Sequence, residues 1–83
     1  MSAVRDVVEV LARALTGRPD EVRVVESEHP QGTALIELYV GNGEMGRVIG
    51  KQGRTAAALR TLAATAGEKI GKIVTIEFRD GRP

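Results

Sequence analysis

Cysteine is absent from this chain of 83 residues, and histidine occurs only once, at position 29. Without cysteine there are no disulfide scaffolds, cysteine zinc sites or thiol nucleophiles. A single imidazole leaves no histidine pair for a metal, so we expect neither a metal nor another cofactor. No apolar run approaches the ~20 residues that span a bilayer, and no cationic stretch precedes an apolar one as in a signal peptide. We therefore expect a cytoplasmic protein without membrane contact.

Aromatic residues are nearly absent as well, since Tyr39 and Phe78 are the only two. Many proteins that bind single-stranded nucleic acid stack its bases on several exposed aromatic rings. This chain lacks the rings for such a platform. If it binds nucleic acid, it must do so in another way.

The net charge of +1 conceals an uneven distribution. Residues 1–40 carry four basic and seven acidic side chains, a net charge of −3, whereas residues 41–83 carry eight basic and four acidic ones, a net charge of +4. A local positive field attracts phosphates even when the whole molecule is nearly neutral. The alternative interpretation is a solvated surface of mixed charge.

Six regular elements are predicted from hydrophobic periodicity and from the positions of Gly and Pro. They are helices over 3–16, 45–49 and 54–66, and strands over 22–27, 33–40 and 72–78. Ser2 is the expected N-cap of the first helix, and Gly67 is expected to end the third. Residues 29–32 are typical of a turn, and the tail 80–83 is expected to be frayed.

The same spacing predicts which side chains face the core. On the first helix these are Val4, Val7, Val8, Leu11 and Leu15, on the third Leu59, Leu62, Ala63 and Ala66, and on the strands Ala34, Ile36, Leu38, Val40, Val74, Ile76 and Phe78. The other sheet face is expected to carry Arg23, Glu37, Tyr39, Thr75 and Glu77. The first two strands should form an antiparallel hairpin, and a helical crossover should return the last strand parallel to the second. The prediction is a single α+β domain, α-β-β-α-α-β, with a three-stranded mixed sheet and three helices on one face.

Five glycines between residues 41 and 53 suggest a phosphate-binding loop. Residues 41–46 match the dinucleotide pattern G-x-G-x-x-G, but further glycines interrupt the helix that should follow, and no acidic residue stands at the required distance. Residues 46–51 resemble a Walker A loop, but only three residues separate the glycines where four are needed. Gln52 also stands where that loop needs Ser or Thr. Neither pattern is supported.

The third possibility is a turn between two helices, Gly50-Lys51-Gln52-Gly53. Glycine at both ends allows a sharp turn and lets a sugar-phosphate chain approach without a Cβ clash. The start of the following helix favours phosphate through its free N–H groups. Arg47, Lys51 and Arg54 add positive charge. The alternative is an ordinary helix–helix turn in which the glycines only cap.

Residues 48–53, Val-Ile-Gly-Lys-Gln-Gly, resemble the V-I-G-x-x-G signature of KH domains, and the element order resembles the type II, bacterial arrangement. Residues 46–55 are similar to the small single-domain proteins of the KhpA (YlqC) family, and the resemblance covers nearly the whole chain. One departure is Ala56, where the family pattern often places a large aliphatic residue. This departure implies a shallower groove wall.

The resemblance implies binding of single-stranded RNA, about four nucleotides of it in a narrow groove. In this chain Gly50, Lys51, Gln52 and Gly53 would clamp the RNA backbone. Ile49 would line the apolar floor, and Arg47 and Arg54 would flank the backbone. The opposite wall is expected from strand 33–40 and the turn 28–32.

The resemblance also implies protein partners, because members of the family are described as self-associating and as partnering KhpB (Jag or EloR), a larger RNA-binding protein. A homodimer, or a heterodimer with a KhpB-like protein, is therefore expected. So is a role as RNA chaperone or post-transcriptional regulator with links to cell shape. A candidate dimer face is the smooth helix with Ala56, Ala57, Ala58, Ala63, Ala64 and Ala66, although alanine is also simply the best helix former.

No catalytic constellation is visible, so we expect that the protein is not an enzyme. Ser27, Thr33 and Thr55 lack a recognisable histidine arrangement. Glu26 and Glu28 are typical of a solvated strand end, as His29 is of an exposed turn. The alternative function is a protein–protein interaction adaptor whose RNA groove is not essential.

Overall fold

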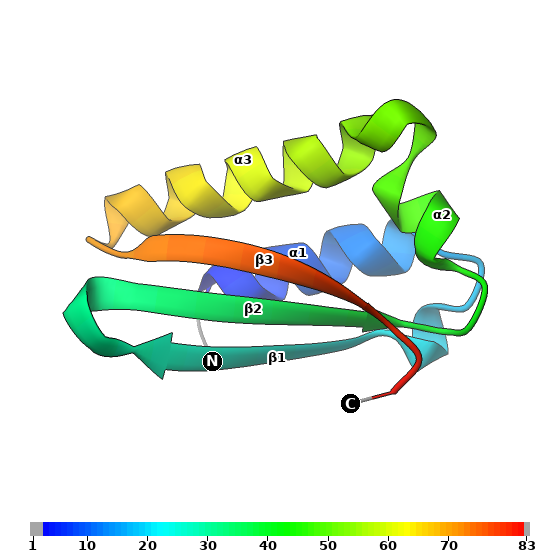
Figure 1. The fold of residues 1–83 in the computed structure, drawn as a ribbon, viewed down its shortest axis with the longest axis horizontal. Helices are drawn as coiled ribbons and strands as arrows, with labels where there is room; N and C mark the ends of the chain where they lie inside the picture. Colours follow the sequence, from blue (N-terminus) through cyan, green and yellow to red (C-terminus); the bar gives the residue numbers. More distant parts are fainter. Residues whose placement is uncertain (1–2, 83) are drawn as a thin grey trace.

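The computed structural model describes residues 3–82, which form a sheet with helices against one of its faces (Figure 1). The elements are α1 (Ala3–Leu15), β1 (Arg23–His29), β2 (Thr33–Val40), α2 (Met45–Ile49), α3 (Arg54–Lys69) and β3 (Ile73–Asp80). Short 3-10 turns lie at Pro19–Glu21, Pro30–Gly32 and Lys51–Gly53. The predicted α-β-β-α-α-β order is confirmed.

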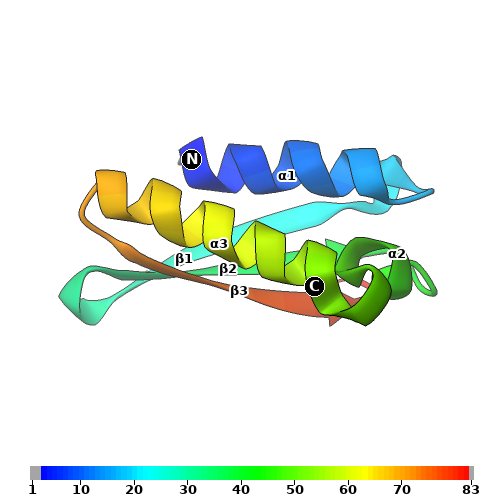
Figure 2. The same cartoon turned by 90° about the horizontal axis from the view of Figure 1, so that it is seen from above.

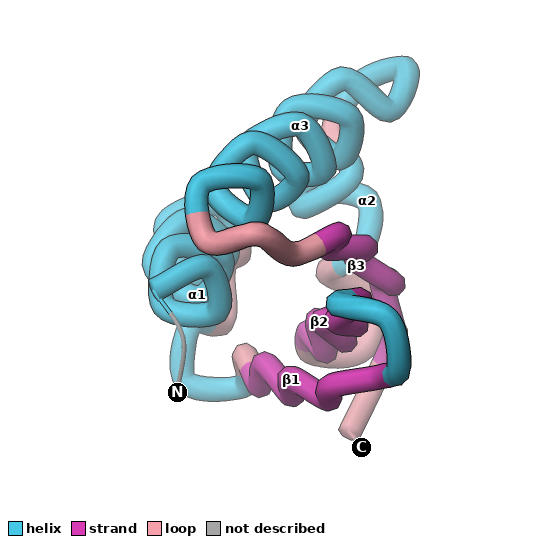
Figure 3. The backbone as a smooth tube through the Cα atoms, turned by 90° about the vertical axis from the view of Figure 1, so that its left-hand side faces the viewer, coloured by secondary structure: helices cyan, strands magenta, loops and turns pink. Residues whose placement is uncertain are grey.

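The sheet has the strand order β1-β2-β3, with β2 in the centre. β1 pairs with β2 antiparallel, as in Val24 opposite Leu38, and β2 pairs with β3 parallel, as in Ile36 opposite Ile76. The predicted hairpin and helical crossover are both confirmed. The helices lie above the sheet in Figure 2, and Figure 3 shows α1 and α3 on the same side of the strands, so that the other sheet face carries none of the three α-helices of residues 3–82.

The core lies between the sheet and the helices, and β2 supplies its centre because its side chains alternate between the two faces. Ala34, Ile36, Leu38 and Val40 are buried, and the intervening residues are half-buried. From the helices, the core receives Val4, Val8, Ala12, Val48, Leu59 and Ala63. These side chains pack against those of the sheet, and the two layers share one hydrophobic cluster.

Three residues predicted to face the core are largely exposed instead: Val7 at 47%, Leu15 at 38% and Leu62 at 50%. In α1 the buried stripe is narrow and repeats every four residues, through Val4, Val8 and Ala12. A sheet of only three strands cannot cover a wider stripe of each helix, since a chain of this size buries a limited share of its surface. The helix layer therefore presents apolar side chains to solvent.

The prediction that Gly67 ends the third helix is wrong, because α3 continues to Lys69 with Gly67 buried inside it. A Cβ on Gly67 would come within 2.6 Å of Val74 Cγ2 and 2.8 Å of the Lys72 carbonyl oxygen. Glycine is needed here for the close approach of α3 to β3. The helix instead terminates through Gly71, whose φ of +72° is the left-handed conformation common after helices.

Smaller differences concern the strand ends. β1 begins one residue later than predicted and continues to His29, and β3 extends from Ile73 through Asp80. The predicted frayed tail is thus wrong at its start, because the Gly81 N–H also donates a hydrogen bond to the Val40 carbonyl, at 2.9 Å. Ser2 and Pro83 lie outside the described residues.

Candidate functional site

The GxxG loop, residues 50–53, joins α2 to α3 at the end of the molecule where β2 also ends (Figure 1). The Gly50 N–H donates to the Gly46 carbonyl at 3.0 Å, which closes α2. The Gly53 N–H donates to the Gly50 carbonyl at 3.1 Å, so that the loop is one tight four-residue turn, in which Gln52 has a left-handed φ of +58°. The loop is therefore held by its own backbone hydrogen bonds.

Gly50 is required at the start of this turn for two separate reasons. Its φ of +80° and ψ of 172° lie in a region that side chains rarely adopt. A Cβ would in addition collide with the Thr55 hydroxyl and lie 3.2 Å from the Thr55 backbone nitrogen. Gly53 also has a positive φ, of +72°, but a Cβ there would meet open space. The two glycines thus differ in the cost of replacement.

Positive charge surrounds the loop. Lys51, Gln52 and Arg54 are exposed, and Arg54 Nη2 donates to Gln52 Oε1 at 3.0 Å. Within residues 3–82 neither Lys51 nor Arg54 forms an ion pair. The Arg47 side chain, one turn earlier, is 67% exposed, and its Nε lies 3.9 Å from Glu44 Oε2. The loop therefore presents uncompensated cations to an anionic ligand.

The apolar side of the site comes from α2. Val48 is fully buried and anchors this short helix in the core, whereas Ile49 beside it is half-buried. Ala56, in the first turn of α3, is also buried, at 4% exposure. All seven residues expected to form the site thus lie in one continuous stretch of α2, the loop and the start of α3.

Glu44 is a residue that sequence reasoning missed. Its carboxylate is only 8% exposed and accepts hydrogen bonds from Thr16 Oγ1 at 2.7 Å and the Gly17 N–H at 2.6 Å. These two bonds tie the start of α2 to the end of α1. The Thr16 hydroxyl, then the Gly17 N–H, and to a lesser extent Arg47 and Arg18, hold the pKa of Glu44 below its ordinary value against the opposing effect of burial.

We expect Glu44→Gln to destabilise the protein at neutral pH and much less in acid. Because the folded pKa is lowered, the charged carboxylate stabilises the fold fully above the unfolded pKa of about 4.3, and this contribution is lost as pH falls through the folded value. Urea unfolding at about pH 7 and about pH 3 measures the difference in the free energy of unfolding between wild type and Glu44→Gln. Glu68→Gln, at an exposed position, should behave like wild type. If Glu44→Gln lowered the free energy of unfolding by the same amount at both pH values, the expectation would be contradicted.

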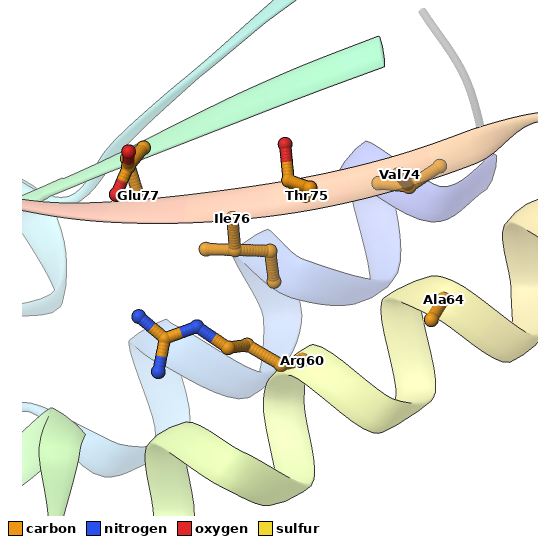
Figure 4. Close-up of a pocket in the computed structure, with 6 residues that line it drawn as sticks. All are labelled: Arg60, Ala64, Val74, Thr75, Ile76 and Glu77. Atoms are coloured by element: carbon orange, nitrogen blue, oxygen red, sulfur yellow. The ribbon is translucent and has the colours of Figure 1, made fainter. Parts of the chain in front are cut away.

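A hollow of about 350 Å³ lies between α3 and β3 (Figure 4). Its lining residues are Arg60, Ala64, Val74, Thr75, Ile76 and Glu77. Ile76 points from β3 toward α3, and Arg60 reaches from α3 toward the strand, whereas Thr75 and Glu77 point to the other side of β3. The Arg60 guanidinium also lies 4.9 Å from the centre of the Phe78 ring.

Neither strand 33–40 nor the turn 28–32, which are expected to form the opposite wall of the groove, lines this hollow. β2 is the central strand, and the strand whose backbone runs beside α3 is β3. The turn Pro30–Gly32 lies near the far end of α3, since a Cβ on Gly32 would be 3.5 Å from the Gly71 carbonyl oxygen. A helix of 16 residues separates that turn from the GxxG loop by about 24 Å. The strand that faces α3 is the one that follows it, β3.

Residues 3–82 contain no group of three His, Asp or Glu side chains that could hold a metal ion. Ser27 Oγ lies 3.1 Å from His29 Nε2, but this pair is exposed. No helix in the same range is long and apolar enough to cross a membrane.

Comparison with known proteins identifies the family. The family model described as "KhpA/KhpB, KH domain" matches residues 5–78. A protein named RNA-binding protein KhpA in Aquifex aeolicus is 52% identical over 78 residues, which are 94% of this chain and 98% of that protein. Proteins of the same name in Halalkalibacterium halodurans and Bacillus subtilis are 47% and 40% identical, over 93% of this chain and 100% and 94% of their own lengths. The chain belongs to the KhpA/KhpB family of KH domains.

Proposed function

We propose that this protein binds single-stranded RNA and that the GxxG loop clamps about four nucleotides of it. The observation that carries the proposal is the loop itself, a tight turn with exposed Lys51 and Arg54, neither of which forms an ion pair with another residue of the range 3–82. The name RNA-binding protein, which relatives at 40–52% identity bear, supports the same ligand class.

Each predicted site residue has a role in this proposal. The glycines Gly50 and Gly53 let the sugar-phosphate backbone approach the turn, and Lys51 and Gln52 contact it there. Arg54 and Arg47 stand on either side and neutralise phosphates, and Ile49 supports the bases. If about three phosphates are neutralised, the logarithm of the affinity falls with the logarithm of salt concentration with a slope of about −2.

In this proposal the bases of the clamped RNA lie in the hollow between α3 and β3. The outer edge of β3 has no strand partner within residues 3–82, so its backbone N–H and C=O groups are available to base edges. Arg60 and Ile76 lie on the path from the loop along α3. This slot suits a chain that lacks an aromatic platform, because base edges are recognised by hydrogen bonds rather than stacking.

The experiment that tests the proposal is a fluorescence anisotropy titration of a labelled single-stranded RNA pool at low salt. It compares the wild-type chain with the Lys51→Asp/Gln52→Asp double variant. Absence of binding by wild type at the lowest salt would overturn the proposal, since salt screening is weakest there.

A single clamp makes few contacts, and this limits the affinity. Linking two binding modules is the usual means of raising it. A dimer, or a complex with a KhpB-like protein, would provide the second module and fits a role as RNA chaperone or post-transcriptional regulator.

The adaptor remains a second candidate because the helix layer exposes apolar side chains. Val7 and Val10 of α1 and Leu62 of α3 are 47%, 67% and 50% exposed. The alanine-rich face expected from the sequence is not a single surface, because Ala56 and Ala63 are buried whereas Ala57, Ala58 and Ala64 are exposed. A self-association surface would therefore be centred on Leu62 and its i−4 neighbour Ala58.

We expect Leu62→Glu to shift the protein toward the monomer if this surface joins two copies. A charge at a buried apolar contact is costly, so the dimer dissociation constant should rise about tenfold or more. Sedimentation equilibrium over a range of concentrations measures it. Ile73→Glu also replaces an exposed aliphatic side chain by glutamate, on the open sheet face, and serves as the control. Equal masses for wild type and Leu62→Glu at every concentration would contradict this interface.

A further inference from the structure

The open face of the sheet carries one row of three side chains that the proposed clamp does not use. The strand register places Arg23 opposite Tyr39 and Tyr39 opposite Arg79. Directly paired side chains in a sheet lie about 5 Å apart. The chain's one tyrosine therefore has an arginine on each neighbouring strand, and we call these three residues the Arg-Tyr-Arg row.

The hydrogen bonds of the row leave its side chains accessible. Tyr39 is half-buried, and both arginines are exposed. The Tyr39 hydroxyl and Arg79 Nε donate to the same oxygen, Oε2 of Glu37, at 3.3 and 3.4 Å. Arg23 Nη1 donates to the backbone carbonyls of Asp20 and Val22. Exposed ion pairs of this length contribute little net stability, so a phosphate can replace Glu37 on Arg79.

The row lies at the end of the sheet where the GxxG loop also lies, because β2 and β3 both run toward that end (Figure 1). Phe78, with Arg60 over its ring, precedes Arg79 and lies on the helix side of the same strand. Both aromatic rings of the chain thus occur beside arginines, on opposite faces of the sheet near the ends of β2 and β3. Glu77, which borders the hollow, and Arg79 in the row are separated by about 7 Å of strand.

We infer that single-stranded RNA held by the clamp continues over the edge of β3 onto the Arg-Tyr-Arg row. There one base stacks on Tyr39, and phosphates bind Arg79 and Arg23. Tyrosine rings stack on bases of any sequence, and guanidinium groups bind phosphate in a bidentate manner. The inference rests on the proposed function. It lengthens the stretch of RNA that the protein contacts beyond the groove.

Charge favours RNA over an apolar protein partner at this place. The row joins two guanidinium groups to one ring and contains no aliphatic side chain. The large exposed aliphatic residues of this face stand in other rows, Val25 beside Glu37 and Ile73 beside Thr33. A partner that buried the row without phosphates would have to desolvate two arginines, which is costly.

The test compares an unstructured RNA of about four nucleotides with one of about ten by fluorescence anisotropy. Tyr39→Leu should leave affinity for the short RNA unchanged and lower affinity for the long RNA about tenfold, the lower range expected for one stacked base. Tyr39→Phe should bind like wild type, and Arg23→Gln should lower the salt slope for the long RNA by about 0.7. Ile73→Ala, at the other end of the face, is the matched control. A long RNA offers more positions at which the protein can bind, and this raises its apparent affinity. The increase is the same for wild type and all variants, so it does not affect their comparison.

The outcomes separate this inference from the proposed function. Equal affinity of wild type, Tyr39→Leu and Arg23→Gln for the long RNA would overturn the row as a binding site, whatever the clamp does. Loss of long-RNA binding in Tyr39→Leu but not in Lys51→Asp/Gln52→Asp would support the row and overturn the clamp. If Tyr39→Leu changes the oligomeric mass but not RNA affinity, the face is a protein interface and the inference is wrong. Arg23→Gln, at an exposed position, keeps the test valid if Tyr39→Leu unfolds.

Discussion

Replacing Lys51 and Gln52 together by aspartate should lower the affinity for single-stranded RNA by about 30-fold or more. The change removes a cation that has no ion pair among the described residues and places two carboxylates where the RNA backbone would lie. A charged hydrogen bond contributes about 1.5–3 kcal/mol, and each 1.4 kcal/mol is a factor of ten in affinity. Anisotropy of a labelled RNA pool at low salt measures the loss.

A matched control separates the loop from the overall field of the protein. Thr65→Asp/Lys69→Asp introduces the same change of charge at the far end of α3, about 20 Å from the loop. The two double variants are compared at about 0.1 M salt, where the Debye length of about 10 Å is shorter than this distance. This control should lose little affinity, and circular dichroism should show both variants folded, since all four residues are exposed. Equal losses in the two double variants would show that binding depends on net charge and not on the clamp.

Gly50→Ala should destabilise the protein by about 2–4 kcal/mol, more than any other single change in the loop. The strained φ and ψ account for about 1–3 kcal/mol, and the collision of the new Cβ with Thr55 adds an overpacking cost. For a domain of this size, the melting temperature should fall by about 10–25 °C. Thermal and urea unfolding of the purified variant measure the loss.

Gly53→Ala provides the comparison, because it shares the positive φ but not the collision. Gly53→Ala should lower the free energy of unfolding by about 1–2 kcal/mol, which is the cost of holding alanine in the left-handed conformation. A Gly50→Ala variant as stable as Gly53→Ala would show that Thr55 and the start of α3 move aside without cost. The loop would then be softer than its hydrogen bonds indicate.

The sequence alone predicted the three α-helices and the three strands of the described residues, because these depend on patterns within short segments, but it did not predict the 3-10 helix Pro19–Glu21. Alternation in residues 33–40 predicted the buried face of β2, and the glycines at 50 and 53 predicted a turn between two helices. The site residues are also local, since residues 47–54 are contiguous along the chain. Short-range periodicity and turn chemistry suffice for such features.

The tertiary structure decided what depends on contacts between distant segments. Glu44 receives its partners Thr16 and Gly17 from 28 and 27 positions away, and Gly67 is explained only by the approach of β3. The sheet order made β3 the wall beside α3, and the register brought Arg23, Tyr39 and Arg79 into one row. No local pattern encodes these pairings, because they depend on how the layers pack and how the strands align.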